Sequence, residues 1–223
     1  YRNCSFARRE KTTGRLMKKA FIIFVLQSAL YYGQIFSFDG FVKITEANSG
    51  GTHTKFINTA KPQVYAISYS DQTISLFDGE KDLRHYFRYR IKDEKPIIKY
   101  LYSYKLKEPK VTTEFTIEKT NEKEYKITEF KNKKRGEPIF EVICKIDETS
   151  MDLSNSISAD ISTHRKAMIH SLLKEEVSTP QNFVIMQQIT DYKNGRVFKR
   201  NTVQFGTMKL ELEVPAKIKF RSL

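Results

Sequence analysis

The sequence predicts an α+β domain in which a mostly antiparallel, strand-rich sheet or open barrel carries one long amphipathic helix. Apolar and polar residues alternate with period two over most of the chain from residue 40 onward, most clearly in TMKLELEV at 207–214. The expected strands are too short and too closely spaced for crossover helices, so neighbouring strands must pair antiparallel. One segment, at 158–177, has helical spacing instead.

About nine strands are expected before the helix and three or four after it. Turn-forming residues separate many of them, as at 48–51, 78–79, 132–136 and 194–195. In chain order, the expected strands lie near residues 41–46, 53–59, 63–69, 72–77, 83–92, 97–105, 110–118, 123–131, 138–147, 183–190, 196–205, 207–214 and 216–221.

The segment SADISTHRKAMIHSLLKEEV at 158–177 is expected to form about five helical turns. Ser158 or Asp160 can cap its N-terminus, and Pro180 ends it. Its acidic residues gather at the C-terminal end, where they oppose the helix macrodipole, so packing against the sheet must supply most of its stability. The residues of its apolar face are Ile161, Met168, Ile169, Leu172, Leu173 and Val177.

Residues 17–37 are expected to form a cleaved secretory signal peptide. Met17 is followed by two lysines and an apolar run at 20–30, which is shorter than the roughly 20 residues that span a bilayer. We expect cleavage after the small residue Ser37, with an uncleaved signal anchor as the alternative. The sequence therefore predicts an extracellular protein without a stable membrane anchor.

Residues 1–16 have no hydrophobic period, and we interpret them as a non-native extension, read from an untranslated region or produced by an incomplete gene model. A genuine cytosolic extension ahead of a signal anchor is the alternative. A single strand-rich domain then covers 38–223, and residues 1–37 should pack little against it. Residues 1–37 contain seven basic residues and one acid, so their removal lowers the net charge from +13 to +7. This moderate positive charge favours anionic partners without specifying one.

The chain has two cysteines, and Cys4 belongs to the segment expected to be removed. The domain would then retain only Cys144, which excludes an internal disulfide. In EPIFEVICKID, alternation places Cys144 on one apolar strand face with Phe140, Val142 and Ile146. We expect an inert, buried thiol there, with an intermolecular disulfide as the alternative.

The stretch LRHYFRYRIKDEKPIIKYLYSYK at 83–105 predicts two strands around a short turn. An even-numbered loop would pair Ile91 with Pro96 and Phe87 with Tyr100. One face would then offer an apolar wall with polar tips to a small apolar or amphipathic ligand. Ordinary cross-strand aromatic packing is the alternative, and single-stranded nucleic acid is not expected for a secreted chain. The ligand-binding candidates on this face are His85, Phe87, Tyr89, Tyr100, Tyr102 and Tyr104.

A basic cluster, KNKKRG at 131–136, lies at a predicted hairpin tip. It suits sulfated glycans or anionic lipid headgroups. The alternative is a solvated turn whose charges protect the sheet edge. The anion-binding candidates are Lys131, Lys133, Lys134 and Arg135.

The sequence predicts no catalytic, metal or cofactor site. His164 and His170 share the expected helix but lie six residues apart, so they lack the three- or four-residue spacing of a zinc pair. The chain also lacks the motifs of zinc proteases, serine hydrolases and phosphate-binding loops. We therefore expect a secreted basic binding protein for a small apolar or amphipathic ligand, and not an enzyme. The alternative is a secreted effector of salivary, venom or parasite type that binds a host protein or anionic glycan through an exposed basic surface.

Overall fold

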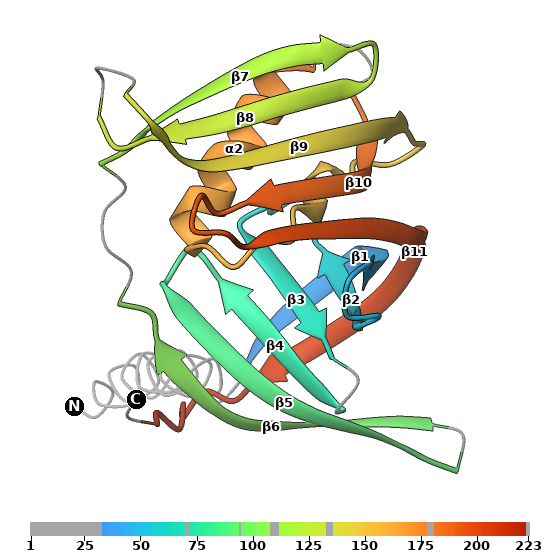
Figure 1. Cartoon of the computed structure of the whole chain (residues 1–223). Coiled ribbons are helices and arrows are strands. Elements are labelled where there is room, and N and C mark those ends of the chain that lie inside the picture. The colour runs from blue at the N-terminus through green and yellow to red at the C-terminus, as the bar shows by residue number, and fades with distance from the viewer. Residues whose placement is uncertain are drawn as a thin grey trace, which may run out of the picture.

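A computed structural model describes residues 33–69, 72–93, 95–107, 112–132, 136–177 and 181–221. Within them, 11 strands form one antiparallel sheet in the order β6-β5-β4-β3-β2-β1-β11-β10-β9-β8-β7. The first and last of these described strands, β1 and β11, pair at the centre of the sheet (Figure 1). Successive hairpins then extend the sheet from this pair in both directions, and β6 and β7 form its two edges.

The strands confirm the strand-rich, antiparallel prediction, and most lie close to their expected positions. Their bounds are Gln34–Glu46 (β1), Thr52–Ile57 (β2), Val64–Ser68 (β3), Thr73–Asp78 (β4), Leu83–Lys92 (β5), Lys95–Lys105 (β6), Glu114–Asn121 (β7), Glu124–Phe130 (β8), Pro138–Glu148 (β9), Phe183–Asp191 (β10) and Val197–Val214 (β11).

The C-terminal strands differ from the prediction. The segments 196–205 and 207–214 form one strand, β11, because Gly206 stays in the ladder opposite Phe41. The strand expected at 216–221 is absent from the described residues, and only an isolated bridge joins Phe220 to Ser103 of β6.

The sheet coils so strongly that β3 and β4 are buried on both faces. All residues from Val64 to Ile67 are buried, although successive side chains of a strand point in opposite directions. One face of β3 and β4 packs against the ends of β1 and β11 in a cluster of buried residues. Their opposite face is directed toward α2 and the turn before it. The buried members of the first cluster are Phe36, Phe38, Phe56, Val64, Ala66, Ile74, Leu76, Phe87, Leu212 and Val214.

The described residues contain one α-helix, α2 (Thr163–Glu176), and one short 3₁₀ turn, η1 (Ser154–Ser156). The helix is shorter than the predicted 158–177, because the Ser162 hydroxyl accepts a hydrogen bond from the backbone N–H of Arg165 and caps the helix there. With a single helix of this length, the fold is mostly β, and α+β describes it only roughly.

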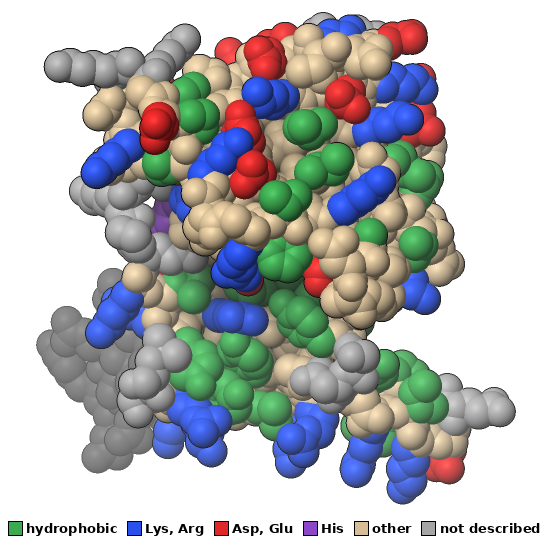
Figure 2. Space-filling view, in the orientation of Figure 1, with side chains coloured by type: hydrophobic (Ala, Val, Ile, Leu, Met, Phe, Trp, Pro, Cys, Tyr) green, Lys and Arg blue, Asp and Glu red, His purple; other side chains and the backbone are tan. Residues whose placement is uncertain are grey.

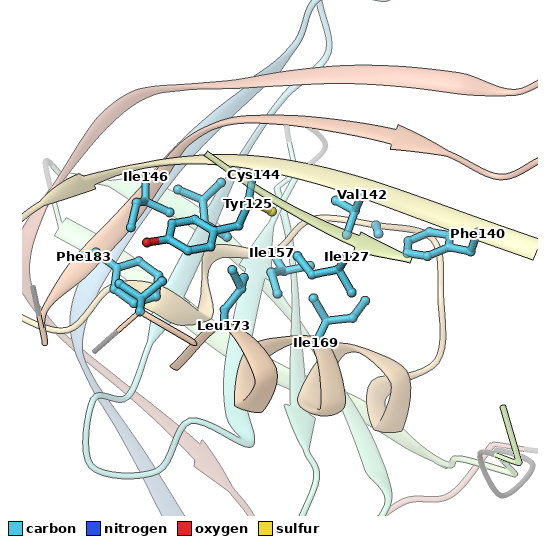
Figure 3. Packing of buried hydrophobic residues seen from close by; sticks show 13 residues of the cluster. Tyr125, Ile127, Phe140, Val142, Cys144, Ile146, Ile157, Ile169, Leu173 and Phe183 are labelled. Carbon is cyan, nitrogen blue, oxygen red and sulfur yellow. The ribbon is translucent and has the colours of Figure 1, made fainter. Parts of the chain in front are cut away.

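Helix α2 covers β8, β9 and β10 with its apolar face (Figures 1 and 3). Ile169 and Leu173 are fully buried against this part of the sheet, as the spacing predicts. Met168, however, is 41% exposed, so its place on the predicted apolar face is wrong. The sheet side of this core includes Phe140, Val142, Cys144 and Ile146, which confirms the alternation expected for β9.

Turn η1 lies over β1 at a glycine. A side chain on Gly40 would place its Cβ only 2.6 Å from the Leu153 side chain, so the sheet accepts the turn only where β1 has no side chain. Leu153 is fully buried with Val42 and Ile44 of β1. This contact positions the segment that leads from η1 to α2.

The N-terminal part of β1 differs from the expected leader boundary. Gln34–Ser37 belongs to β1, and Phe36 is 6% exposed and lies opposite Leu212 of β11. The expectation that everything before Phe38 packs little against the domain is therefore wrong for these residues. Residues 1–32 lie outside the described part of the chain, so the signal peptide itself stays a prediction.

Candidate functional site

A hollow of about 470 Å³ lies between the inner face of the sheet and the segment that joins η1 to α2. The sheet supplies side chains from β1 to β5 and from β11, and α2 supplies its first turn. The lining mixes apolar and charged groups: Glu46, Gly51, Thr52, His53, Lys55, Ile67, Tyr69, Phe77, Arg84, Leu106, Ile157, Ser158, Ala159, Asp160, Ile161, Thr163, Lys166 and Arg200.

Strand alternation directs His53 and Lys55 into this hollow. The two residues share a face of β2 with Ile57, which is buried beneath η1 in a cluster with Leu153. In the sheet, Lys55 lies opposite Ile67 of β3, another lining residue. A lysine therefore occupies a position where the pattern of the strand calls for an apolar residue.

Lys55 is buried without a carboxylate partner among the described residues. Its side chain is 1% exposed, and its Nζ donates to Asn155 Oδ1 at 3.3 Å and to the backbone carbonyl of Ile157 at 3.2 Å. The ammonium also lies 4.3 Å from the centre of the Tyr65 ring. Burial lowers the pKa of Lys55 well below its usual value, and the nearby charge of Lys166 lowers it further. Lysine is seldom fully buried without an acid, so this position has an uncompensated electrostatic cost.

Three further cations line the hollow, and each of them contacts an aromatic ring. The Arg84 guanidinium lies 4.6 Å from the Phe77 ring centre and donates to Ser75 Oγ at 3.2 Å. Its Nε is buried and makes no hydrogen bond. Lys166 Nζ lies 5.9 Å from the centres of the Tyr65 and Phe77 rings. Aromatic faces stabilise these cations without neutralising them.

Arg200 forms an ion pair with Glu46, an acid of the lining. A guanidinium nitrogen of Arg200 lies 3.1 Å from Glu46 Oε1. The contact is an ion pair without a hydrogen bond, since Glu46 Oε1 accepts none. Arg200 Nη1 also donates to the backbone carbonyl of Ser158 at 2.9 Å. Asp160, the second acid of the lining, is exposed. The lining therefore has a surplus of positive charge.

His53 adds no charge to this surplus near neutral pH. Its Nε2 lies 3.1 Å from Ser158 Oγ, and burial lowers its pKa to about 4, with further lowering by Arg200 and Lys55. The ring is therefore a neutral hydrogen-bonding group that can orient a polar ligand atom.

The apolar part of the lining completes an amphipathic chamber. Ile67, Phe77, Leu106, Ile157 and Ile161 come from the sheet and from the segments beside it. A ligand with an anionic head and an apolar body would meet complementary groups at both of its ends.

The predicted tyrosine-rich face is divided by a β-bulge. The expected pairs Ile91–Pro96 and Phe87–Tyr100 are confirmed. A register shift between Tyr86 and Phe87 then places Tyr102 opposite Tyr86, so Tyr102 and Tyr104 lie on the other face from Phe87 and Tyr100. The prediction that all six candidates share one face is wrong, because alternation does not reveal an extra residue on one strand.

The other four candidates lie on the face of β5 and β6 that packs against the ends of β1 and β11. His85 is 1% exposed, its Nδ1 lies 2.6 Å from Ser103 Oγ, and burial lowers its pKa to about 4. Phe87 is a buried member of the core cluster there, and Tyr89 and Tyr100 are partly buried against it. Phe87 and Tyr100 also line a second hollow of about 560 Å³ whose wall includes Glu211 and Glu213.

The predicted anion-binding turn is only partly described. Lys131 is exposed at the end of β8, and Lys133, Lys134 and Arg135 lie outside the described residues. The charged groups of the chamber that Lys55 lines, in contrast, were not predicted from the sequence. The signal that could have revealed them is Lys55, a charged residue at an inward position of a strand that alternates His53, Lys55 and Ile57.

Comparison with known protein-family models gives no match, and no curated protein sequence matches this chain significantly. In the part of the chain that the structure describes, no helix is long and apolar enough to cross a membrane. No group of three or more histidine, cysteine or acidic side chains in the same part could hold a metal ion.

Proposed function

We propose that the protein is a secreted, non-enzymatic binding protein that holds a small amphipathic anion in the chamber beneath α2. The observation that carries this proposal is Lys55, which is buried at the wall of the chamber with neutral acceptors and an aromatic ring around its ammonium group. A carboxylate or phosphate on a ligand would supply the counter-charge that the described residues do not. This would convert an electrostatic cost of the empty chamber into a contribution to affinity.

The dimensions and chemistry of the chamber support a small ligand. Its volume of about 470 Å³ lies within the range typical of small-molecule sites. The second hollow, beside Phe87 and Tyr100, is of similar size but has Glu211 and Glu213 in its wall. Lys99 is the one cation among the described residues that line it. Those carboxylates would repel an anion, so the chamber at Lys55 is the better candidate for the ligand that we propose.

Calorimetric titration with matched probes tests this function. A medium-chain fatty acid should bind, whereas the alcohol with the same chain should bind at least tenfold more weakly, because it lacks the charge that the cations recognise. Arg84→Gln should weaken binding of the acid and leave binding of the alcohol almost unchanged. Lys43→Gln is the matched control, because Lys43 is exposed on β1 and does not line the chamber.

Two results would reject the proposal. One is equal affinity for the acid and the alcohol, which would mean that the cations have no role in recognition. The other is an equal loss of affinity in the Arg84 and Lys43 variants, which would indicate a general effect of net charge.

A further inference from the structure

The hairpin of β5 and β6 extends beyond the rest of the sheet as a two-stranded arm (Figure 1). The ladder between β4 and β5 ends at the pair Thr73–Arg88, whereas β5 and β6 stay paired as far as Lys92–Lys95. Within the described ranges, the end of the hairpin therefore has no other strand beside it.

Five basic residues occupy one face of this hairpin. The register places Arg88 opposite Lys99 and Lys92 opposite Lys95, with Arg90 between them on the same face. All five side chains are exposed, and none forms an ion pair with a described carboxylate. Figure 2 shows lysine and arginine side chains gathered along this edge of the molecule.

The charge arrangement is unfavourable for the hairpin alone. Like charges directly opposite each other destabilise a pair of strands, and the arm contains two such pairs. Lysines on an edge strand can protect a sheet from aggregation, but Arg88 still pairs with both β4 and β6, so edge protection does not account for the Arg88–Lys99 pair. An anionic surface would offset the repulsion between these side chains.

An apolar residue lies within the basic face. Ile97 is opposite Arg90 and is 39% exposed among the five cations. A basic surface with an exposed aliphatic side chain matches the interface of an anionic bilayer, where headgroups attract the cations and the aliphatic group enters the acyl boundary. A soluble polyanion would attract the cations but would gain little from Ile97.

We propose that the basic face of the β5–β6 arm docks reversibly on an anionic lipid bilayer. The five cations lie against the headgroups, and Ile97 enters the interface between them. The same face of β5 continues through Tyr86 to Arg84, which lines the ligand chamber, so docking would bring the chamber close to the membrane surface.

Vesicle sedimentation tests the docking surface with the full secreted chain. The protein should bind vesicles of phosphatidylcholine with phosphatidylserine, and binding to vesicles of phosphatidylcholine alone should be much weaker. The double substitution Arg90→Gln with Lys92→Gln should weaken binding to the anionic vesicles roughly thirtyfold, from the contribution of two basic residues near an anionic surface. The control is Lys43→Gln with Lys217→Gln, which makes the same charge change at exposed positions outside the arm and should retain affinity.

Ile97→Ser separates a bilayer from a soluble polyanion. It should weaken binding to the anionic vesicles and leave retention on heparin unchanged. If Ile97→Ser leaves vesicle binding unchanged, the arm recognises anionic charge alone, and the lipid proposal is wrong. Absence of vesicle binding, or equal loss in both double variants, would also overturn it, whereas the fatty-acid titration addresses the chamber independently.

Discussion

At the scale of single residues, Lys55 should link the proposed ligand binding to proton uptake. Burial and Lys166 lower its pKa, so its ammonium form is disfavoured in the empty chamber. An anionic ligand beside it would favour the ammonium form and raise its pKa, so binding should take up a proton and should strengthen as the pH falls. Calorimetry in buffers with different ionisation enthalpies measures this uptake directly.

Lys55→Met is the variant that tests this linkage. The variant should lose the proton uptake and bind the fatty acid more weakly. Its free energy of unfolding should stay the same or rise, because replacing a buried amine that has no acidic partner among the described residues by an apolar group removes a desolvation cost. Undiminished proton uptake in Lys55→Met would show that another group titrates.

Three histidines should make the fold sensitive to acid. Burial lowers the pKa of His53, His85 and His170 to about 4, from an ordinary value of 6.5. Between these two pH values the unfolded chain binds more protons than the folded chain, so stability is complete above pH 6.5 and is lost as the pH falls to about 4. The loss should reach at most about 3 kcal/mol for each histidine.

Urea unfolding between pH 6.5 and 4 measures this dependence, and His85→Gln should reduce it by about a third, since one of three contributing groups is removed. A denaturation midpoint that stays constant through this range would contradict the prediction.

Sequence patterns predict correctly which residues are buried where the buried residues are also apolar. Cys144 follows the alternation of β9, and it is fully buried with its pKa raised to about 12 by burial, as expected of an inert thiol. Lys55 breaks this agreement, because a charged residue in a strand is normally assigned to solvent. Only its distant contacts with Asn155 and Ile157 reveal that it is buried.

At the scale of elements, the start of α2 depends on one side chain. Ser162 accepts a hydrogen bond from the backbone N–H of Arg165, so Ser162→Ala should lower the free energy of unfolding by about 1 kcal/mol. Ser171→Ala is the matched control, because Ser171 is exposed within the helix and alanine has a higher helix propensity there. Equal destabilisation of the two variants in urea would contradict the capping role.

The ends of elements and their irregularities were less predictable than the elements themselves. Ser158, Asp160 and Ser162 are all capable caps, and sequence spacing alone does not single out Ser162, which caps the helix. The bulge beside Phe87 was equally hard to predict, because the sequence of β6 alternates regularly through the extra residue. This single residue redirects Tyr102 and Tyr104 and changes which aromatic side chains can form one wall.

At the scale of the whole molecule, the fold depends on coiling that local patterns do not describe. Alternation predicts a sheet with one buried face, yet β3 and β4 are buried on both faces because the ends of β1 and β11 pack against one of them. The chamber arises on the opposite face, beneath α2 and the segment before it. Its residues come from distant parts of the chain, so sequence spacing alone could not assemble them.

Substitutions at the N-terminal end of β1 test whether the stability of the protein depends on this coiling. Phe36 is buried in the cluster against β3 and β4, so Phe36→Ala should lower the free energy of unfolding by about 3–5 kcal/mol. Ile35 is its neighbour on the same strand but is 61% exposed, so Ile35→Ala should change stability little. Similar urea midpoints for the two variants would show that the strand does not depend on this contact.

The same contact predicts where a secreted form of the protein begins. Cleavage after Ser37, which the sequence alone suggests, would remove Phe36 and the β1 residues that lie opposite Leu212, Glu213 and Val214. We therefore expect secreted protein to begin at or before Gln34, and a chain that starts at Phe38 to unfold at lower urea concentration than one that starts at Gly33. N-terminal sequencing of secreted material and urea titration of the two chains measure these outcomes. A secreted chain that begins at Phe38 and equals the longer chain in stability would show that Gln34–Ser37 is dispensable to the fold.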